Sequence, residues 1–238
     1  GGFALLFDVL DTCYNNGRMR KVWSNESGST GEAGDASVGR VVFQTINALK
    51  ICGSAIPSNH VELGTASSLV KIKAVAVSAL RDEEMLTLCT DIFLCAVSEI
   101  GSEADAACTR MCSDELGIPQ FIMTALSAHP EYADFALVAL ALLERLSSID
   151  ACYKAINMDR LTAIVGDLVA VHGGTSEVGT RANALLDSGL SVQVATPETV
   201  IETLRTYASY VPHMPERPDL APHVLKYSND LASFSHTH

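Results

Sequence analysis

The segment LGIPQFIMTAL, residues 116–126, decides the fold because a second segment with the same apolar spacing follows it. That second segment is MDRLTAIVGDL, residues 158–168, in which Ile164 lies 42 positions after Ile122 and Leu168 lies 42 positions after Leu126. Apolar residues at three- and four-residue steps indicate amphipathic helices. The two segments therefore predict a helix that occurs twice in equivalent surroundings.

A longer predicted helix follows each segment, and these longer helices also match. Three positions of one helix match three of the next at a spacing of 46 residues: Glu131, Ala136 and Leu140 with Glu177, Ala182 and Leu186. A preceding helix matches at 47 residues: Glu84, Cys89 and Phe93 with Glu131, Ala136 and Leu140. Short predicted helices, 104–111 and 150–156, precede the best-matched pairs. The unit is short helix, long helix, long helix, repeated every 42–47 residues, and we expect an all-α fold.

This order and period resemble those of the armadillo-repeat family. The resemblance is carried by Gly117-Ile118-Pro119 at the start of a second helix, by residues 136–143 as the third helix of that unit, and by residues 1–10 as another second helix. Pro119 suits a first helical turn, where its missing N–H has no intrahelical acceptor. The resemblance implies a right-handed α-solenoid of three-helix repeats, whose units bury their apolar faces by stacking.

The predicted organisation has two parts. Residues 1–190 form the repeat array, which includes a long polar loop over residues 15–39. Residues 191–238 form a C-terminal extension, with a helix that begins at Thr196-Pro197, a proline-rich linker and a short helix over residues 223–234. The predicted array begins on a second helix with no first helix before it, so we expect either further residues upstream of Gly1 or another protein that covers this end.

Composition excludes several classes of function. The chain has 28 acidic and 16 basic residues, a formal net charge of −12, and so lacks the basic balance that nucleic-acid binding needs. Its longest apolar run, residues 135–143, is too short to span a membrane. Seven cysteines, an odd number, favour free thiols in a reducing compartment: the cytoplasm, a cilium or an organelle matrix, without secretion.

No motif predicts catalysis, a cofactor or a metal site, so we do not expect an enzyme or a small-molecule ligand. The glycines at 28, 31 and 34 lack the Lys-Ser/Thr pair of a phosphate-binding loop. Cys108 and Cys112 lie one helical turn apart, but no histidine motif completes the four ligands of a structural zinc site. Trp23 either anchors a partner protein or folds back onto the array, and the sequence leaves both readings open.

The resemblance also implies that the third helices line a concave groove. Three stripes then face this groove: Thr87, Asp91, Cys95; Asp134, Val138, Leu142; and Thr180, Ala184, Ser188. The stripes lack the Trp and Asn ladder of nuclear-import adaptors and the Lys and Arg of catenin-type members. The predicted protein-binding residues are Trp23, Thr87, Asp91, Asp134, Val138, Leu142 and Ser188.

We therefore expect a non-enzymatic scaffold for protein–protein interaction, a structural subunit of a larger multiprotein assembly. The alternative is a transient adaptor or chaperone cofactor that binds a peptide segment in the concave groove. In both cases the partners are other proteins, and the acidic charge favours a basic or partly apolar partner surface.

Overall fold

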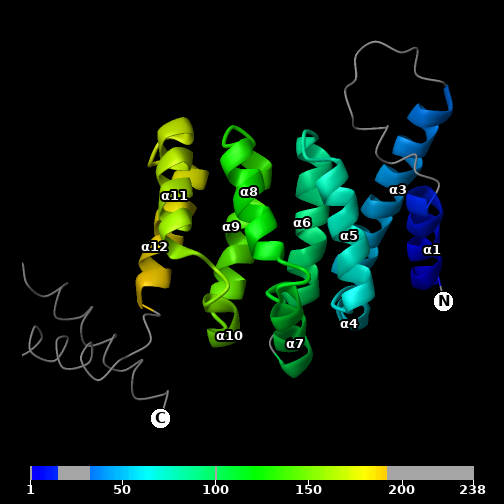
Figure 1. The fold of residues 1–238 in the computed structure, drawn as a ribbon, viewed down its shortest axis with the longest axis horizontal. Helices are drawn as coiled ribbons and strands as arrows, with labels where there is room; N and C mark the ends of the chain where they lie inside the picture. The colour runs from blue at the N-terminus through cyan, green and yellow to red at the C-terminus, as the bar shows by residue number, and fades with distance from the viewer. Residues whose placement is uncertain (1, 16–32, 100, 192–238) are drawn as a thin grey trace, which may run out of the picture. The chain divides into compact units, whose positions relative to one another are not determined.

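The computed structural model describes residues 2–15, 33–99 and 101–191, and every regular element within them is an α-helix (Figure 1). The all-α prediction is confirmed for these residues. The chain divides into two compact units, Gly1–Leu186 and Asp187–His238. The core and the surfaces described below belong to the first unit.

The helices fall into four successive groups along the chain. The first group contains α1 (Gly2–Asn15) and α3 (Ala33–Ala55). The second contains α4 (Ser58–Leu63), α5 (Ala66–Ser78) and α6 (Glu83–Val97). The third contains α7 (Ser102–Met111), α8 (Ile118–Ala128) and α9 (Ala133–Ser147). The fourth contains α10 (Asp150–Tyr153), α11 (Met158–His172) and α12 (Glu177–Ser191).

The most extensive helix packing lies within a group or between successive groups. Helix α6 packs against α3 on one side and α9 on the other, while α8 packs against α11 and α7 against α10 (Figure 1). The largest fully buried side chains include Phe93 of α6 and Phe135 of α9. The apolar core is continuous from α1 to α12, because each group covers the apolar face of its neighbour.

Polar residues at the helix starts explain where several helices begin. Asp82 caps α6 by accepting a hydrogen bond from the Met85 N–H at 3.1 Å. Asn157 caps α11 in the same way, by accepting from the Arg160 N–H at 2.9 Å. Each such cap typically stabilises a helix by about 1 kcal/mol, because it satisfies an N–H that has no partner within the helix.

Gly117 precedes α8 in the left-handed backbone conformation, with φ 51° and ψ 39°. Side chains with a Cβ atom adopt this conformation at a cost, so glycine suits the reversal between α7 and α8. Pro119 lies in the first turn of α8. The predicted place of Pro119 in a first helical turn is therefore confirmed.

Replacing Gly117 by alanine should lower the free energy of unfolding by about 1 kcal/mol, because alanine is strained at positive φ. Gly166 gives a matched control, since it lies within α11 and a Cβ atom there meets no atom within 4 Å. Gly166→Ala should raise stability by roughly 0.5–1 kcal/mol through helix propensity. Urea unfolding followed by circular dichroism measures both changes. If the two replacements changed the free energy of unfolding in the same direction, the argument from the left-handed backbone at Gly117 would be contradicted.

The pattern of burial fixes how the long helices correspond. In α6 and α9 the buried positions coincide at a spacing of 50 residues: Met85 with Phe135, Leu86 with Ala136, Cys89 with Ala139, and Phe93 with Leu143. In α9 and α12 they coincide at 43 residues: Phe135 with Val178, Ala139 with Ala182, and Leu142 with Leu185. The predicted spacings of 47 and 46 residues are therefore each displaced by three residues.

A displacement of three residues has a simple physical cause. Apolar positions on one helix face recur after three or four residues, so an alignment shifted by three still pairs many apolar residues. The predicted correspondence of α8 with α11 agrees with the structure, because Ile122, Leu126, Ile164 and Leu168 are all buried.

Three further predictions concern the polar loop, the C-terminal extension and membrane-spanning segments. Helix α3 begins at Ala33, so residues 33–39 of the predicted loop are helical. Residues 16–32, which include Trp23, and the predicted C-terminal helices beyond residue 191 lie outside the described residues. Within the described part of the chain, no helix has the length and apolar character needed to cross a bilayer.

Candidate functional site

The predicted stripe on α6 is partly exposed, but its polar atoms already have partners. Asp91 Oδ2 lies 2.5 Å from Lys50 Nζ of α3. The Cys95 thiol lies 3.5 Å from the Ser54 hydroxyl, also on α3, and the Thr87 hydroxyl donates to the Glu83 carbonyl within α6. The contacts of Asp91 with Lys50 and of Cys95 with Ser54 join α3 to α6, and Lys50 neutralises the Asp91 charge within the chain.

The predicted stripe on α9 needs a correction. Leu142 is completely buried in the core, so it does not offer its side chain to a ligand. Asp134 is exposed in the first turn of α9, where the helix dipole stabilises its charge, and Val138 is partly exposed. The error comes from the predicted spacing of 47 residues. With the observed spacing of 50 residues, Leu142 corresponds to Ile92, which is also buried.

The same spacing identifies the α9 positions that correspond to Thr87, Asp91 and Cys95. They are Leu137, Ala141 and Arg145, and all three are partly exposed. Of the predicted α12 stripe, Thr180 and Ala184 are exposed. Ser188 lies in α12, but its side chain, like all of Trp23, is outside the part of the chain that the structure describes.

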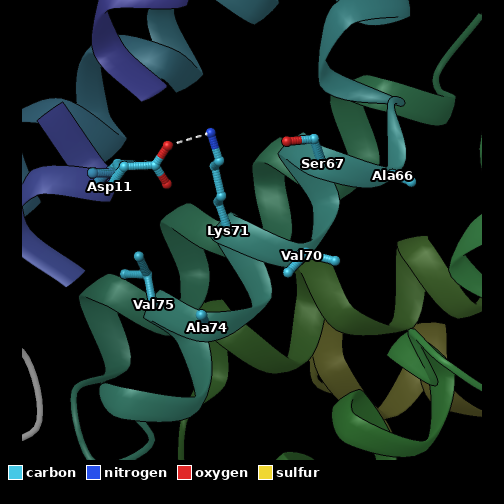
Figure 2. A pocket seen from close by; sticks show the side chains of 8 residues that line it. Asp11, Ala66, Ser67, Val70, Lys71, Ala74 and Val75 are labelled. Carbon is cyan, nitrogen blue, oxygen red and sulfur yellow. Dashed lines mark ion pairs between the residues drawn. The ribbon is translucent and has the colours of Figure 1, made fainter. Parts of the chain in front are cut away.

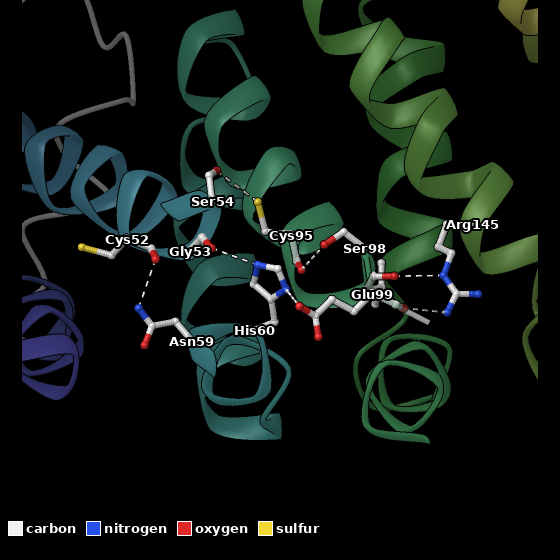
Figure 3. Close-up of polar contacts among 10 residues, drawn as sticks. Cys52, Gly53, Ser54, Asn59, His60, Cys95, Ser98, Glu99 and Arg145 are labelled. Carbon is white, nitrogen blue, oxygen red and sulfur yellow. Dashed lines mark hydrogen bonds and ion pairs between the residues drawn. The ribbon is translucent and has the colours of Figure 1, made fainter. Parts of the chain in front are cut away.

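Arg145 holds the end of α6 and was not singled out from the sequence. Its Nε donates to the Val97 carbonyl at 2.9 Å, and one terminal nitrogen donates to the Glu99 carbonyl at 3.4 Å (Figure 3). The same terminal nitrogen also pairs with Asp105 Oδ1 at 2.9 Å. An arginine near a helix C-terminus often binds the last carbonyls of its own helix. The carbonyls that Arg145 binds lie 46 and 48 residues away in the sequence, so the sequence alone did not identify them.

A second polar cluster lies around His60 of α4 (Figure 3). His60 Nε2 contacts the Gly53 carbonyl at 2.9 Å, and Nδ1 lies 3.6 Å from Glu99 Oε1. The His60 side chain is only 13% exposed and borders a cavity of about 250 Å³ that Glu99 and Glu103 also line. Asn59 donates to the Cys52 carbonyl at 3.0 Å. The cluster thus satisfies the carbonyls near the end of α3 and ties α3, α4 and the end of α6 together.

An apolar pocket lies between α1 and α5 (Figure 2) and has a volume of about 390 Å³. Its lining residues are Leu10, Asp11, Ala66, Ser67, Val70, Lys71, Ala74 and Val75. Lys71 Nζ lies 2.7 Å from Asp11 Oδ2 and 5.6 Å from the centre of the Phe7 ring. The two charges compensate one another, so the pocket offers an apolar surface with little net charge.

Exposed large apolar side chains in the described residues are concentrated in the first two helix groups, which include the two pocket helices. Leu5 is 64% exposed and Val9 is 37% exposed, on the side of α1 that does not pack on the core. Seven more are found in the described residues: Val41, Ile51, Ile56, Val61, Val70, Val77 and Val171. Only Val171 lies beyond α5, so the first two helix groups carry most of this apolar surface.

The described residues contain no cluster of three or more His, Cys, Asp or Glu side chains that could hold a metal ion. The comparisons with protein-family models, curated proteins and solved structures find no match for this chain.

Proposed function

We propose that this chain is a non-enzymatic scaffold for protein–protein interaction, built as a short α-solenoid of armadillo-like repeats. The spacing of the long-range polar contacts supports the repeat arrangement. Five of them join residues 42–48 positions apart, close to one repeat: Lys73 to the Leu116 carbonyl, Arg110 to the Gly64 carbonyl, Arg145 to the Val97 and Glu99 carbonyls, and His172 to the Pro130 carbonyl.

Such contacts are what stacked units require, because each unit bonds mainly to the next one along the chain. Side chains of one helix group satisfy backbone carbonyls at the loops and helix ends of its neighbour. Stability then depends on the interfaces between neighbouring groups, and the outer surfaces remain available for binding other proteins.

The observation that carries the proposed function is the apolar surface on α1, α3 and α5. Leu5 and Val9 are exposed apolar side chains of α1, and Val70 is an exposed apolar side chain of α5 that lines the pocket. Exposed apolar side chains on helices that also form an apolar pocket are typical of a protein-binding site, because burying them against a partner releases water from apolar groups. The partner that fits best presents an apolar helix face.

The alternative, an adaptor that holds a peptide on the face of the third helices, has less support. Asp91 is paired with Lys50 at 2.5 Å, so it has little free charge for a basic peptide. Leu142 is buried and gives that face no apolar contact. The apolar surface of the first two helix groups therefore defines the proposed docking site.

Changing Leu5 and Val9 together to glutamate should abolish binding of the partner while the fold is retained. Both side chains face away from the core, so their replacement costs little folding energy. Losing two buried apolar side chains from an interface costs roughly 3 kcal/mol, or about 100-fold in affinity. Purification of the tagged full chain under mild conditions, with identification of the retained proteins by mass spectrometry, measures the effect.

Val171→Glu is the matched control, because Val171 is 51% exposed on α11, away from the proposed site. The control variant should retain the same partner in the same amount as the unchanged chain. A monodisperse monomer with no bound protein would contradict the proposal, as would a partner that is retained by the Leu5 and Val9 variant.

A further inference from the structure

We propose that the solvent-facing side of α5 binds an amphipathic helix of a partner protein, whose apolar residues recur at heptad spacing and are flanked by acidic residues. This inference rests on the proposed scaffold function and deepens it, because it states the chemistry that the partner presents. Two features carry it: the spacing of the exposed residues of α5, and the hollows that border α5 on both sides.

Four residues define this surface, called the α5 face below: Ser67, Val70, Ala74 and Val77. They follow one another at steps of three, four and three residues, which keeps them on one side of the helix. Val70 is 54% exposed and Val77 is 52% exposed, whereas Ile72 on the opposite side is completely buried. Helices of a coiled coil present their contact residues at this same spacing. The α5 face therefore has the pattern that a second helix recognises.

A hollow borders the α5 face on each side. The pocket of about 390 Å³ between α1 and α5 is lined by Ser67, Val70 and Ala74 (Figure 2). A second hollow, of about 560 Å³, lies between α5 and α8, where Val77 and Phe121 line it. Packed helices insert the side chains of one between those of the other. Hollows on both sides of α5 can thus receive the two rows of apolar side chains that such a partner helix carries.

The corresponding surface of α8 is polar, so the fold itself does not require apolar residues there. Buried positions of α5 and α8 coincide at a spacing of 50 residues, as they do in α6 and α9: Ile72 with Ile122, Val75 with Ala125, and Ala76 with Leu126. At this spacing the last three residues of the α5 face correspond to three exposed polar residues of α8: Gln120, Thr124 and Ser127. The two exposed valines are therefore a particular property of the α5 face.

Basic residues flank the α5 face, although the chain as a whole has a net charge of −12. Helix α5 contains Lys71 and Lys73 and no acidic residue. Lys71 lines the α1 side, where Asp11 lies 2.7 Å away and compensates its charge. Lys73 lines the α8 side and donates to the Leu116 carbonyl, a neutral group that does not cancel its charge, while Asp114 lines the same hollow. A glutamate of the partner beside Lys73 is attracted, and a lysine there is repelled.

A pair of synthetic peptides tests this chemistry. Each has about 21 residues in three heptads, with leucine at both apolar positions, and the flanking positions are all glutamate in one peptide and all lysine in the other. The like charges keep each peptide from pairing with itself near neutral pH. The full chain should bind the glutamate peptide, and it should bind the lysine peptide about three- to tenfold more weakly. Fluorescence anisotropy of the labelled peptides at low ionic strength measures both affinities.

A variant of the α5 face locates the binding. Replacing Val70→Gln and Val77→Gln together should weaken binding of the glutamate peptide by at least about tenfold, because two apolar contacts with the peptide are lost. Both side chains are exposed, so the variant should retain the helical circular dichroism of the unchanged chain. Ser127→Gln is the matched control, since Ser127 is exposed at the position of α8 that corresponds to Val77. Its affinity for the glutamate peptide should equal that of the unchanged chain.

Several results would overturn the inference. They are no binding of either peptide, equal binding of both, and binding that survives the replacement of Val70 and Val77. A dimer of the unchanged chain that this replacement converts to a monomer would also overturn it, because a second copy would then cover the α5 face. If the peptides fail while a protein still copurifies through Leu5 and Val9, this inference is wrong and the proposed function stands.

Discussion

Replacing Phe93 by alanine is expected to lower the free energy of unfolding by about 3–5 kcal/mol, the range for removing a fully buried phenylalanine. Phe93 has no exposed surface and lies on α6, which packs against both α3 and α9. A cavity at this position therefore weakens two interfaces between helix groups. Urea unfolding followed by circular dichroism measures the loss.

Phe121→Ala gives the matched control, because Phe121 lies on α8 at the edge of the core and is only partly buried. Its replacement should cost under about 2 kcal/mol, since less apolar surface returns to water. If both replacements cost the same, the central position of α6 in the core would be contradicted.

Replacing Gly179 by alanine is expected to have a comparably large effect, confined to the fourth helix group. A Cβ atom at Gly179 would overlap the Gly173 carbonyl oxygen and would lie 2.9 Å from the Gly174 Cα atom. Both neighbours are backbone atoms that cannot rotate away, so α12 must shift from its connection to α11. We expect a loss of about 3 kcal/mol, at the upper end for an overpacked site.

Gly174→Ala is the control for this prediction, because a Cβ atom there meets only Val169 Cγ1, at an ordinary distance of 3.7 Å. Its free energy of unfolding should change by less than about 1 kcal/mol. Hydrogen exchange locates the effect: Gly179→Ala should increase exchange in α11 and α12, and not in α3 to α6. Unchanged exchange in α12 would contradict the close approach of the Gly173 and Gly174 backbone to Gly179.

The type and order of the helices could be predicted from the sequence, but the register between them could not. Helical periodicity, together with Gly117 and Pro119 at the start of α8, is a local signal, and it identified α6, α8, α9, α11 and α12 as helices. The correspondence of α6 with α9 was displaced by three residues, because a helix offers near-equivalent apolar matches after three or four residues. Burial of Leu142 follows from this displacement, since its partner in α6 is Ile92.

Contacts between distant residues explain the rest of what the sequence did not predict. The Lys50–Asp91 pair and the α1–α5 pocket both depend on how helices from different groups are placed side by side. One signal for the docking surface was present: Leu5 and Val9 lie four residues apart on α1, whose other side buries Phe7 and Leu10. A helix that is apolar on both sides is usually covered on both sides.

The central claim, that the first two helix groups bind another protein, is tested most directly by hydrogen–deuterium exchange. Exchange in the tagged full chain is measured twice, first in the complex that copurifies with it and then after the bound protein has been removed. The account predicts that binding slows exchange in α1, α3 and α5, with little change in α11. Slower exchange confined to α9 and α12 would contradict it and would instead favour peptide binding on the face of the third helices.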